Sequence, residues 1–324
     1  MKLPILEKLK EGERFDFGTL ADNVEQTDEF LGWWWSEKYK EGVISRPEII
    51  ADNDPLLTPT AQKPTADLSC CPEFFDRMLL NATRDGRLPP RSRLSRPHYR
   101  ELLLSIVAAS SIRLSSRPQI VFTGGGYGSG KTTILNFLAQ SEVIPVQLAH
   151  LVGVDVFKPL IPEYNLIKAV ADGRASLTVQ QECKELANEL FDGLVGLGRS
   201  FAWDSSMSDA ADTLAKMRHA KEHNYELSLI GVLTPLEVAI RQAMNRAKDS
   251  RRFPHPEALP KSHAGFRKAL NEYIPFFDEV MVFARLEGVA EPVVVAEKKA
   301  GANELAILDE KTFTAALILP IKQP

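Results

Sequence analysis

The sequence of 324 residues has little cysteine and no long apolar run. Its three cysteines are Cys70, Cys71 and Cys183, which form neither a disulfide framework nor a Cys-x-x-Cys motif. No stretch reaches the roughly 18 apolar residues of a membrane-spanning helix. The first ten residues, MKLPILEKLK, carry charges where a signal peptide needs its apolar region. These absences indicate a reducing compartment, and we expect a protein of the bacterial cytoplasm.

The sequence also lacks an excess of basic residues. A formal net charge of −4 and a pI of about 6.0 give no bulk attraction for nucleic acid or for an acidic membrane surface. The apolar fraction of 44% and the charged fraction of 25% are ordinary for a globular protein. A chain of this length can bury one substantial core and carry either a small extra domain or a long extension.

The chain divides into two parts of different composition. Residues 1–97, called the N-terminal extension below, hold a tryptophan run at 33–35 and several proline-rich stretches without periodicity. We expect a helical extension there, with short helices at 19–40 and 72–82 and proline-rich linkers. Residues 98–324 are expected to form the main domain.

From residue 98 onward, short apolar strands alternate with amphipathic helices. The expected strands are 118–125, 150–155, 200–204 and 226–233, and the expected helices are 98–114, 131–140, 178–198, 210–223 and 235–249. This alternation predicts an α/β fold of the P-loop NTPase type, with a doubly wound, mostly parallel sheet and helices on both faces. A hairpin at 292–308 is expected at the sheet edge.

A glycine-rich loop follows the first of these strands. It matches Gly-x-x-x-x-Gly-Lys-[Ser/Thr], in which bare backbone amides surround phosphate oxygens, Lys131 supplies a mobile charge and the Thr132 hydroxyl can ligate Mg²⁺. The alternative is a flexible turn with an incidental lysine. The segment fails Gly-x-Gly-x-x-Gly, which disfavours NAD as a Rossmann cofactor. We expect the nucleotide to be bound by Gly125, Gly126, Tyr127, Gly128, Ser129, Gly130, Lys131, Thr132 and Thr133.

Two aspartates stand where expected strands end. In open α/β sheets ligands bind beyond the carboxyl ends of the strands, and Asp155 and Asp204 both fall there. A kinase needs a carboxylate that orients the acceptor hydroxyl and accepts its proton, and we assign this role to Asp155. Asp204 is expected to order Mg²⁺ and its waters. The alternative for both residues is an N-cap of the following helix.

A group of arginines is the last set of candidate catalytic residues in the sequence. Arg241, Arg246, Arg251 and Arg252 lie within one expected helix and the turn after it. Phosphoryl transfer spreads charge over equatorial oxygens, which planar guanidinium groups stabilise well. The alternative is a solvated basic helix end, which is favourable with the helix dipole.

Together these motifs resemble the zeta-toxin family of P-loop kinases over about residues 118–285. The family pattern of a strand ending in aspartate, a phenylalanine and His-Pro is similar to VDVFKPLIPEY in this chain. The later family motifs are similar to the helix carrying Glu182, to LGRSF, to AWDSSMSD, and to Arg241 and Arg246 followed by RRFPHPEALPKSH. Five motifs in the right order make the resemblance specific, although it covers only about half of the chain.

The resemblance implies a toxin kinase that moves the γ-phosphate of ATP, with Mg²⁺, to a hydroxyl of a UDP-amino sugar, typically UDP-N-acetylglucosamine. Lys131 would hold the phosphates, Thr132 the metal, and Asp155 would be the base. Glu182, Asp204 and Ser206 would face the acceptor or the metal. Arg246 and Arg252, with Arg241 as a third candidate, would clamp the transferring group.

The chain departs from the family pattern on the acceptor side. Ser205 and Ser206 replace the usual Gly-Thr or Thr-Thr, Ile161 stands where histidine is common, and Arg251 replaces a glycine. Some bacterial effector kinases of this superfamily act on NAD, so NAD is the alternative acceptor and delivery into another cell the alternative location. The expected partners are ATP, a small nucleotide-sugar or dinucleotide acceptor, and either an antitoxin-like protein or the N-terminal extension as an inhibitor in cis.

Three other classes of function are a zinc protease, a polynucleotide kinase and a non-catalytic nucleotide switch. HAKEH at 219–223 matches an inverted zinc-protease motif, but no third ligand follows at a suitable distance. RSRLSRPHYR at 91–100 could follow a nucleic-acid backbone, as in a polynucleotide kinase, although a solvated linker is the more common explanation. A non-catalytic nucleotide switch predicts the loss of the acid at 155 or of the arginines, and both are present.

Overall fold

The structure is a computed structural model. It describes residues 54–66, 94–108, 117–141, 143–144, 151–169, 174–250, 258–285 and 292–317. The expected helices at 19–40 and 72–82 and the tryptophan run at 33–35 lie outside these residues. The helical character of the N-terminal extension therefore stays a prediction.

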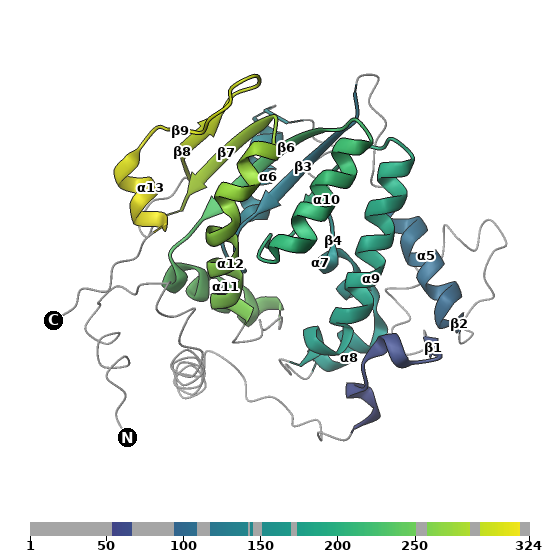
Figure 1. Ribbon diagram of the computed structural model, residues 1–324. Helices are drawn as coiled ribbons and strands as arrows, with labels where there is room; N and C mark the ends of the chain where they lie inside the picture. Colours follow the sequence, from purple (N-terminus) through teal and green to yellow (C-terminus); the bar gives the residue numbers. More distant parts are fainter. Residues whose placement is uncertain are drawn as a thin grey trace, which may run out of the picture.

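The described part of the main domain is built on a seven-stranded sheet with the order β4-β5-β3-β6-β7-β8-β9 (Figure 1). The strands are β3 (Gln119–Gly124), β4 (Leu151–Gly153), β5 (Phe201–Asp204), β6 (Glu226–Leu233), β7 (Glu279–Ala284), β8 (Val293–Lys298) and β9 (Ala306–Ile307). Neighbouring strands from β4 to β7 are parallel, and β8 and β9 continue the sheet antiparallel at one edge. The predicted doubly wound, mostly parallel fold is confirmed.

Helices connect the parallel strands and cover the sheet. They are α5 (Arg96–Ala108), α6 (Lys131–Gln140), α7 (Val154–Phe157), α8 (Pro162–Ala169), α9 (Ala175–Gly196), α10 (Ala210–Glu222), α11 (Leu236–Ser250), α12 (Ala258–Tyr273) and α13 (Glu310–Leu317), with 3₁₀ turns η5 (Lys158–Leu160) and η6 (Ile274–Phe276). In Figure 1, α5 and α9 flank the β4 edge of the sheet and α13 lies beside β8 and β9. None of the helices in the described residues has the length and apolar character needed to cross a membrane.

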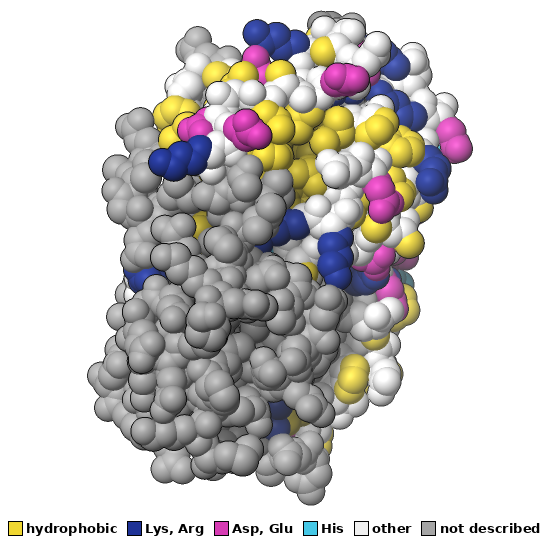
Figure 2. All heavy atoms as spheres, turned by 60° about the vertical axis from the view of Figure 1, so that its left-hand side comes forward, with side chains coloured by type: hydrophobic (Ala, Val, Ile, Leu, Met, Phe, Trp, Pro, Cys, Tyr) yellow, Lys and Arg dark blue, Asp and Glu magenta, His cyan; other side chains and the backbone are white. Residues whose placement is uncertain are grey.

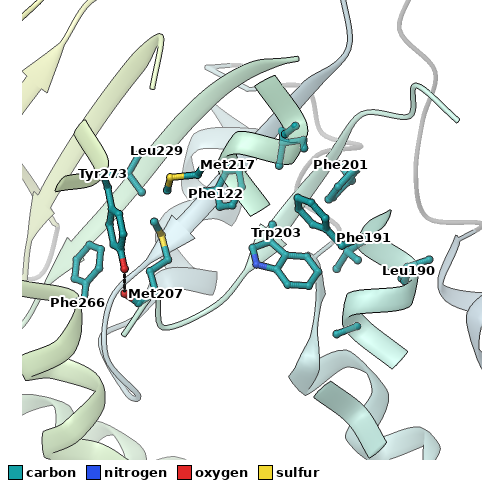
Figure 3. Packing of buried hydrophobic residues seen from close by; sticks show 14 of the residues in the cluster. Phe122, Leu190, Phe191, Phe201, Trp203, Met207, Met217, Leu229, Phe266 and Tyr273 are labelled. Atoms are coloured by element: carbon teal, nitrogen blue, oxygen red, sulfur yellow. Dashed lines mark hydrogen bonds between the residues drawn. The ribbon is translucent and has the colours of Figure 1, made fainter. Parts of the chain in front are cut away.

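Each face of the sheet has its own apolar core, because alternate side chains of a strand point to opposite faces. Val121 of β3 packs with Ile134 and Leu138 of α6 in the smaller core. Phe122, the next residue of β3, belongs to the larger core with the side chains of α9, α10 and α12. In that core Phe191 stacks edge-on against Trp203 with ring centroids 5.0 Å apart (Figure 3). The two cores fix the sheet between its helices and hold the carboxyl ends of the strands in place.

Part of the N-terminal extension packs directly on this domain. Residues 54–66 contain η1 (Pro55–Leu57), η2 (Thr60–Gln62) and β1 (Thr65–Ala66), and β1 pairs antiparallel with β2 (Leu94–Ser95) just before α5. Thr60 and Ala66 are fully buried. η2 contacts α9 and η1 contacts α8. In the described residues the extension is therefore joined to the domain rather than separate from it.

Several observed elements are absent from the set expected from the sequence, and the longest of them in the main domain are α12 and β7; the others are the short elements α7, α8, α13, β1 and β2. Both α12 and β7 follow residues 251–257, which lie outside the described residues. The run EVMVFA of β7 has the apolar and β-branched character of a strand, and this signal could have been recognised. Strand β4 is also shorter than expected: it ends at Gly153, so Asp155 lies in the first turn of α7 rather than at the end of a strand.

A few large apolar side chains are exposed at the antiparallel edge of the sheet. They are Val293 of β8 and Ile307 and Leu308 in and after β9. Figure 2 turns this side of the molecule forward and shows hydrophobic side chains among charged ones on the described surface.

Candidate active site

The glycine loop connects β3 to α6 at the carboxyl edge of the sheet. Gly128 and Gly130 have φ angles of 76° and 91°, a left-handed conformation that favours glycine. A side chain at Gly128 would overlap the main chain at Ala239 of α11. Thr234, just after β6, donates from Oγ1 to the carbonyl oxygen of Ser129 at 3.0 Å. Conformation and close packing therefore both require the bare backbone that the sequence motif predicts.

Lys131 begins α6 and reaches back over this loop. Its Nζ donates to the carbonyl oxygen of Gly125 at 2.8 Å, so the ammonium group lies above the loop. Thr132 and Thr133 follow in the first turn of the helix, and both are exposed. The residues of the predicted phosphate site are thus together at the amino end of α6, where backbone amides and the helix dipole favour an anion.

Two residues of α12 hold the centre of the loop, and neither was assigned a role from the sequence, although both belong to the run RRFPHPEALPKSH. The N–H of Tyr127 donates to Ser262 Oγ at 3.0 Å, and His263 Nε2 donates to the carbonyl oxygen of Tyr127 at 2.9 Å. The His263 ring lies against Gly126, where any side chain would overlap it. Burial lowers the pKa of His263 to about 3, so the imidazole is neutral and carries its proton on the nitrogen that faces Tyr127.

A cavity of about 230 Å³ opens beside the loop, on the β4 and β5 side of β3. It brings together five of the predicted residues, which are Tyr127, Lys131, Asp155, Asp204 and Ser206. Its other walls come from α7, from α9, from the end of β5 with the segment after it, and from the start of α10, namely Val154, Gln180, Lys184, Asn188, Trp203, Ser205, Met207, Ser208, Asp209, Asp212 and Thr213. Most of the lining residues have polar or charged side chains.

Asp155 is paired with a buried cation. Its Oδ1 lies 2.8 Å from Lys158 Nζ, three residues further along the chain, and Lys158 is only 3% exposed. The Asp155 side chain keeps 34% of its surface accessible and lines the cavity. The ammonium of Lys158 thus holds the carboxylate in one orientation. The Asp-x-x-Lys spacing was present in the sequence but was not interpreted.

Asp204 ends β5 and is fixed by the neighbouring strand. The parallel register places Thr123 of β3 opposite Asp204, and Thr123 Oγ1 donates to Asp204 Oδ1 at 2.8 Å. The N-cap considered for Asp204 belongs instead to Asp209, whose side chain accepts from the N–H of Asp212 at 3.2 Å. Asp204 therefore presents its carboxylate at the cavity wall.

The segment after Asp204 lies across the start of the glycine loop. The carbonyl oxygen of Ser206 accepts from the N–H of Gly125 at 3.4 Å. Ser206 Oγ is 2.8 Å from Ser208 Oγ, so two hydroxyl groups lie together at the cavity. Met207 between them has a φ of 51° and is further held by a hydrogen bond from Tyr273 Oη to its carbonyl oxygen at 2.8 Å (Figure 3).

The structure does not bring Glu182 to the cavity. Glu182 is fully buried, and Arg96 binds it with two hydrogen bonds, from Nε to Oε1 and from Nη2 to Oε2, each 2.8 Å long. The side of α9 that lines the cavity carries Gln180, Lys184 and Asn188, four residues apart and thus on one face. Glu182 lies two residues from both Gln180 and Lys184, so its side chain faces away from the cavity.

The predicted arginines are not among the described residues that line the cavity. Arg241 and Arg246 are exposed on α11, and Arg252 lies outside the described residues. Helix α11 touches the loop at Gly128 through Ala239 and Ala243. Arg246 shares the face of Ala243, three residues before it, whereas Arg241 is two residues from both alanines and lies on another side of the helix.

The described residues of the two alternative motifs make contacts within the protein. The His219 and His223 rings stack with centroids 4.5 Å apart, and no cluster of three or more metal-ligating side chains occurs in the part of the chain that the structure describes. In the arginine-rich segment, Arg96 is buried with Glu182, and Arg100 lies 2.6 Å from Glu185. These two arginines are therefore engaged by carboxylates rather than presented to a nucleic-acid backbone.

A parallel α/β sheet with a glycine loop, a lysine at the start of the next helix and an aspartate in the adjoining cavity defines a P-loop phosphotransferase. The family model named zeta toxin matches residues 107–291, more than half of the chain. The chain therefore belongs to the zeta toxin family, as its sequence motifs indicated, and is an ATP-dependent kinase.

Solved structures resemble the chain at low sequence identity. The native AvrRxo1-ORF1:ORF2 complex aligns with a TM-score of 0.58 at 20% identity over 81% of this chain and 82% of that chain. The AvrRxo1-ORF1:ORF2 complex with ATP gives a TM-score of 0.56 at 21% identity over 71% and 75%. A PezAT structure from Streptococcus pneumoniae gives 0.47 at 17% identity over 59% and 79%. The AvrRxo1 comparisons show a shared fold, and no curated protein matches the chain.

Proposed function

We propose that this kinase transfers the γ-phosphoryl group of Mg-ATP to a hydroxyl of a small nucleotide-type acceptor bound in the cavity beside the glycine loop. One observation carries the proposal: Lys131 of the phosphate loop and Asp155 line the same cavity. A crystal structure of the similar AvrRxo1-ORF1:ORF2 complex with ATP supports ATP as the donor. We propose a UDP-amino sugar as the acceptor, with NAD as the alternative.

Asp155 is the proposed general base. Its carboxylate would accept the proton of the acceptor hydroxyl as that oxygen attacks the γ-phosphorus. Lys158, at 2.8 Å, would keep the carboxylate aimed at the cavity. Lys131 would neutralise charge on the phosphates, and Arg246 and Arg252 would stabilise the transferring group once α11 and the turn after it close on the donor. Arg241 is the weaker third candidate because of its position on α11.

Thr132 and Asp204 are the proposed metal site. A threonine hydroxyl and a carboxylate are hard oxygen ligands of the kind that Mg²⁺ prefers, so the residues present fit this ion. When bound, Mg²⁺ would neutralise charge on the donor phosphates. Asp204, held by Thr123, would order waters at this position, and Thr132 would contribute its exposed hydroxyl.

The acceptor would be recognised by the polar walls of the cavity. Ser206, Ser208 and Asn188 offer groups that bind sugar hydroxyls, and the Trp203 ring gives a flat apolar surface. Lys184 is the positive group at this wall, 3.9 Å from Asp209, and could meet an acceptor phosphate. Glu182 would act indirectly, by anchoring α9 through Arg96 rather than by touching the acceptor.

The test is to incubate the protein with Mg-ATP and a panel of UDP-sugars and NAD, and to measure the products by mass spectrometry. We expect one acceptor to gain the mass of one phosphoryl group. The Asp155→Asn variant should lower kcat by about 10²–10⁴-fold, the usual contribution of a general base, while ATP binding is kept. Asp192→Asn, at a side chain that is 70% exposed and outside the cavity, is the matched control. Normal transfer by Asp155→Asn would refute the base assignment.

We further propose that an antitoxin-like protein or residues 1–53 restrain this activity. The AvrRxo1-ORF1:ORF2 crystal structures are complexes of two different chains, which supports a partner in trans. Deletion of residues 1–53 leaves the packed segment 54–66 in place. Higher turnover after this deletion would favour restraint in cis, whereas unchanged turnover would exclude residues 1–53 as the inhibitor.

A further inference from the structure

An arginine outside all the motifs lies against the phosphate loop. Arg285 follows the last residue of β7, and its backbone N–H donates to the carbonyl oxygen of Leu233 at the end of β6 with a length of 2.9 Å. Its side chain extends to the loop, where Nη1 occupies the space that a side chain at Gly130 would need. Gly130 directly precedes Lys131 and caps the amino end of α6.

Within the described residues, the guanidinium of Arg285 makes neither an ion pair nor a side-chain hydrogen bond, and Arg285 is only partly buried. Lys131 and the amino end of α6 place further positive potential beside it. Positive groups gathered at one place favour the binding of an anion, and a guanidinium is well shaped to bind phosphate oxygens in pairs.

The position of Arg285 separates it from the acceptor cavity. That cavity lies on the β4 and β5 side of β3, and Arg285 is not among its lining residues. In the sheet order β4-β5-β3-β6-β7, strand β7 is on the opposite side of β3. With the γ-phosphate near Lys131 and Asp155, the rest of the donor must extend away from the acceptor, towards β6 and β7.

We propose that Arg285 binds the α- and β-phosphates of the donor nucleotide, and that it determines donor affinity rather than the chemistry of transfer. This inference rests on the proposed placement of the γ-phosphate beside Asp155. Arg285 is thus a donor-binding residue directly after β7, on the side of the loop opposite Asp155, the proposed base.

The experiment measures equilibrium binding of ATP, ADP, AMP and adenosine by calorimetry, without any acceptor. We expect Arg285→Gln to weaken ATP and ADP binding by about 10- to 100-fold, the range for a hydrogen bond to a charged group, and to leave adenosine binding unchanged. Arg285→Lys should restore part of the loss, because it keeps the charge without the paired geometry. In turnover, Arg285→Gln should raise the KM for ATP while kcat at saturation and the KM for the acceptor stay the same.

Arg218→Gln is the matched control, because it makes the same change at another arginine. The Arg218 guanidinium lies over the Phe276 ring in η6, and η6 precedes β7, whereas Arg285 follows β7. Equal ATP and ADP affinities in the wild type and Arg285→Gln would overturn the inference. The inference would also be overturned if Arg285→Gln weakened the binding of adenosine, AMP, ADP and ATP by the same factor. That result would indicate that Arg285 stacks on the base instead of binding the phosphates. Failure of the wild-type protein to bind ATP would instead refute the proposed function.

Discussion

At the scale of single residues, the site depends on contacts that leave no trace in a motif. Gly126 must be glycine because the His263 ring occupies the space beside its Cα, and His263 in turn holds the carbonyl oxygen of Tyr127. Lys158 is also buried, and it holds the Asp155 carboxylate through an ion pair. Such residues act through the groups they hold, so their substitution tests the positioning of the loop and of the proposed base.

His263 predicts a pH dependence of stability. Its pKa is lowered from 6.5 to about 3 by burial, so the unfolded chain binds the proton more readily than the folded one. The stability that depends on a neutral His263 is complete above pH 6.5 and is lost progressively as the pH falls towards 3. His263→Gln keeps a donor for Tyr127 but cannot titrate, so its free energy of unfolding should change less between pH 6.5 and pH 4. Urea denaturation at several pH values in this range measures the free energy of unfolding of the wild type and of His263→Gln. An equal dependence on pH in both proteins would contradict the prediction.

At the scale of elements, one helix performs two tasks through two faces. Along α9, Gln180, Lys184 and Asn188 line the cavity, whereas Glu182 is buried against Arg96. Helix α11 has a similar division, because Ala239 and Ala243 pack on the glycine loop while Arg241 and Arg246 remain exposed. A residue's position around a helix therefore decides its role more than its distance along the chain.

For α11 this division predicts unequal arginines. Arg246 shares the face of the loop-packing Ala243, so Arg246→Ala should lower kcat/KM by about 10²-fold or more, as expected for the loss of a charge-stabilising donor. Arg241→Ala should change it by less than about 5-fold, a free-energy effect below roughly 1 kcal/mol. Steady-state kinetics of both variants decide the matter. A larger effect at Arg241 than at Arg246 would mean that α11 turns on closing.

At the scale of the whole molecule, a buried charge network joins the N-terminal extension to the domain. Arg96 binds Glu182 of α9 and lies 3.2 Å from Glu163 of α8, and Lys63 of the 54–66 segment lies 3.8 Å from the same Glu163. The network connects residues far apart in sequence around α9, which also forms the cavity wall. The segment 54–66 is thus part of the support of the active site.

Removal of Arg96 should therefore be strongly destabilising. Arg96→Met leaves the Glu182 carboxylate buried without its partner, which costs about 3–5 kcal/mol in comparable cases. Arg96→Met with Glu182→Met should recover part of this loss, because an apolar pair needs no partner charge. Arg100→Met on the same helix removes a more exposed pair with Glu185 and should cost no more than about 1 kcal/mol. Chemical denaturation of the three variants compares them, and a mild effect of Arg96→Met alone would show that Glu182 has another partner.

Much of the fold could be predicted from the sequence, and the site only in part. The alternation of strands and helices and the loop before Lys131 were predicted correctly, because both depend on local periodicity and on glycine spacing. Helix α12 and strand β7 were missed, and with them Ser262, His263 and Arg285, which meet the loop only in three dimensions. Glu182 was assigned to the acceptor from its motif position, but its partner Arg96 is distant in sequence and no local pattern could reveal the pair.

The class of chemistry is already encoded in the local sequence, since a glycine-rich turn before Lys131 and Thr132 has few uses other than holding phosphates. Which acidic and basic groups reach that turn depends on how the chain folds. The fold places Asp155 and Asp204 at one cavity and buries Glu182 against Arg96. It also brings Arg285 to Gly130 from the β7 side of β3, opposite to the side on which the cavity lies. The physical reason is that backbone conformation is encoded locally, whereas the partner of a charged side chain depends on how distant elements pack.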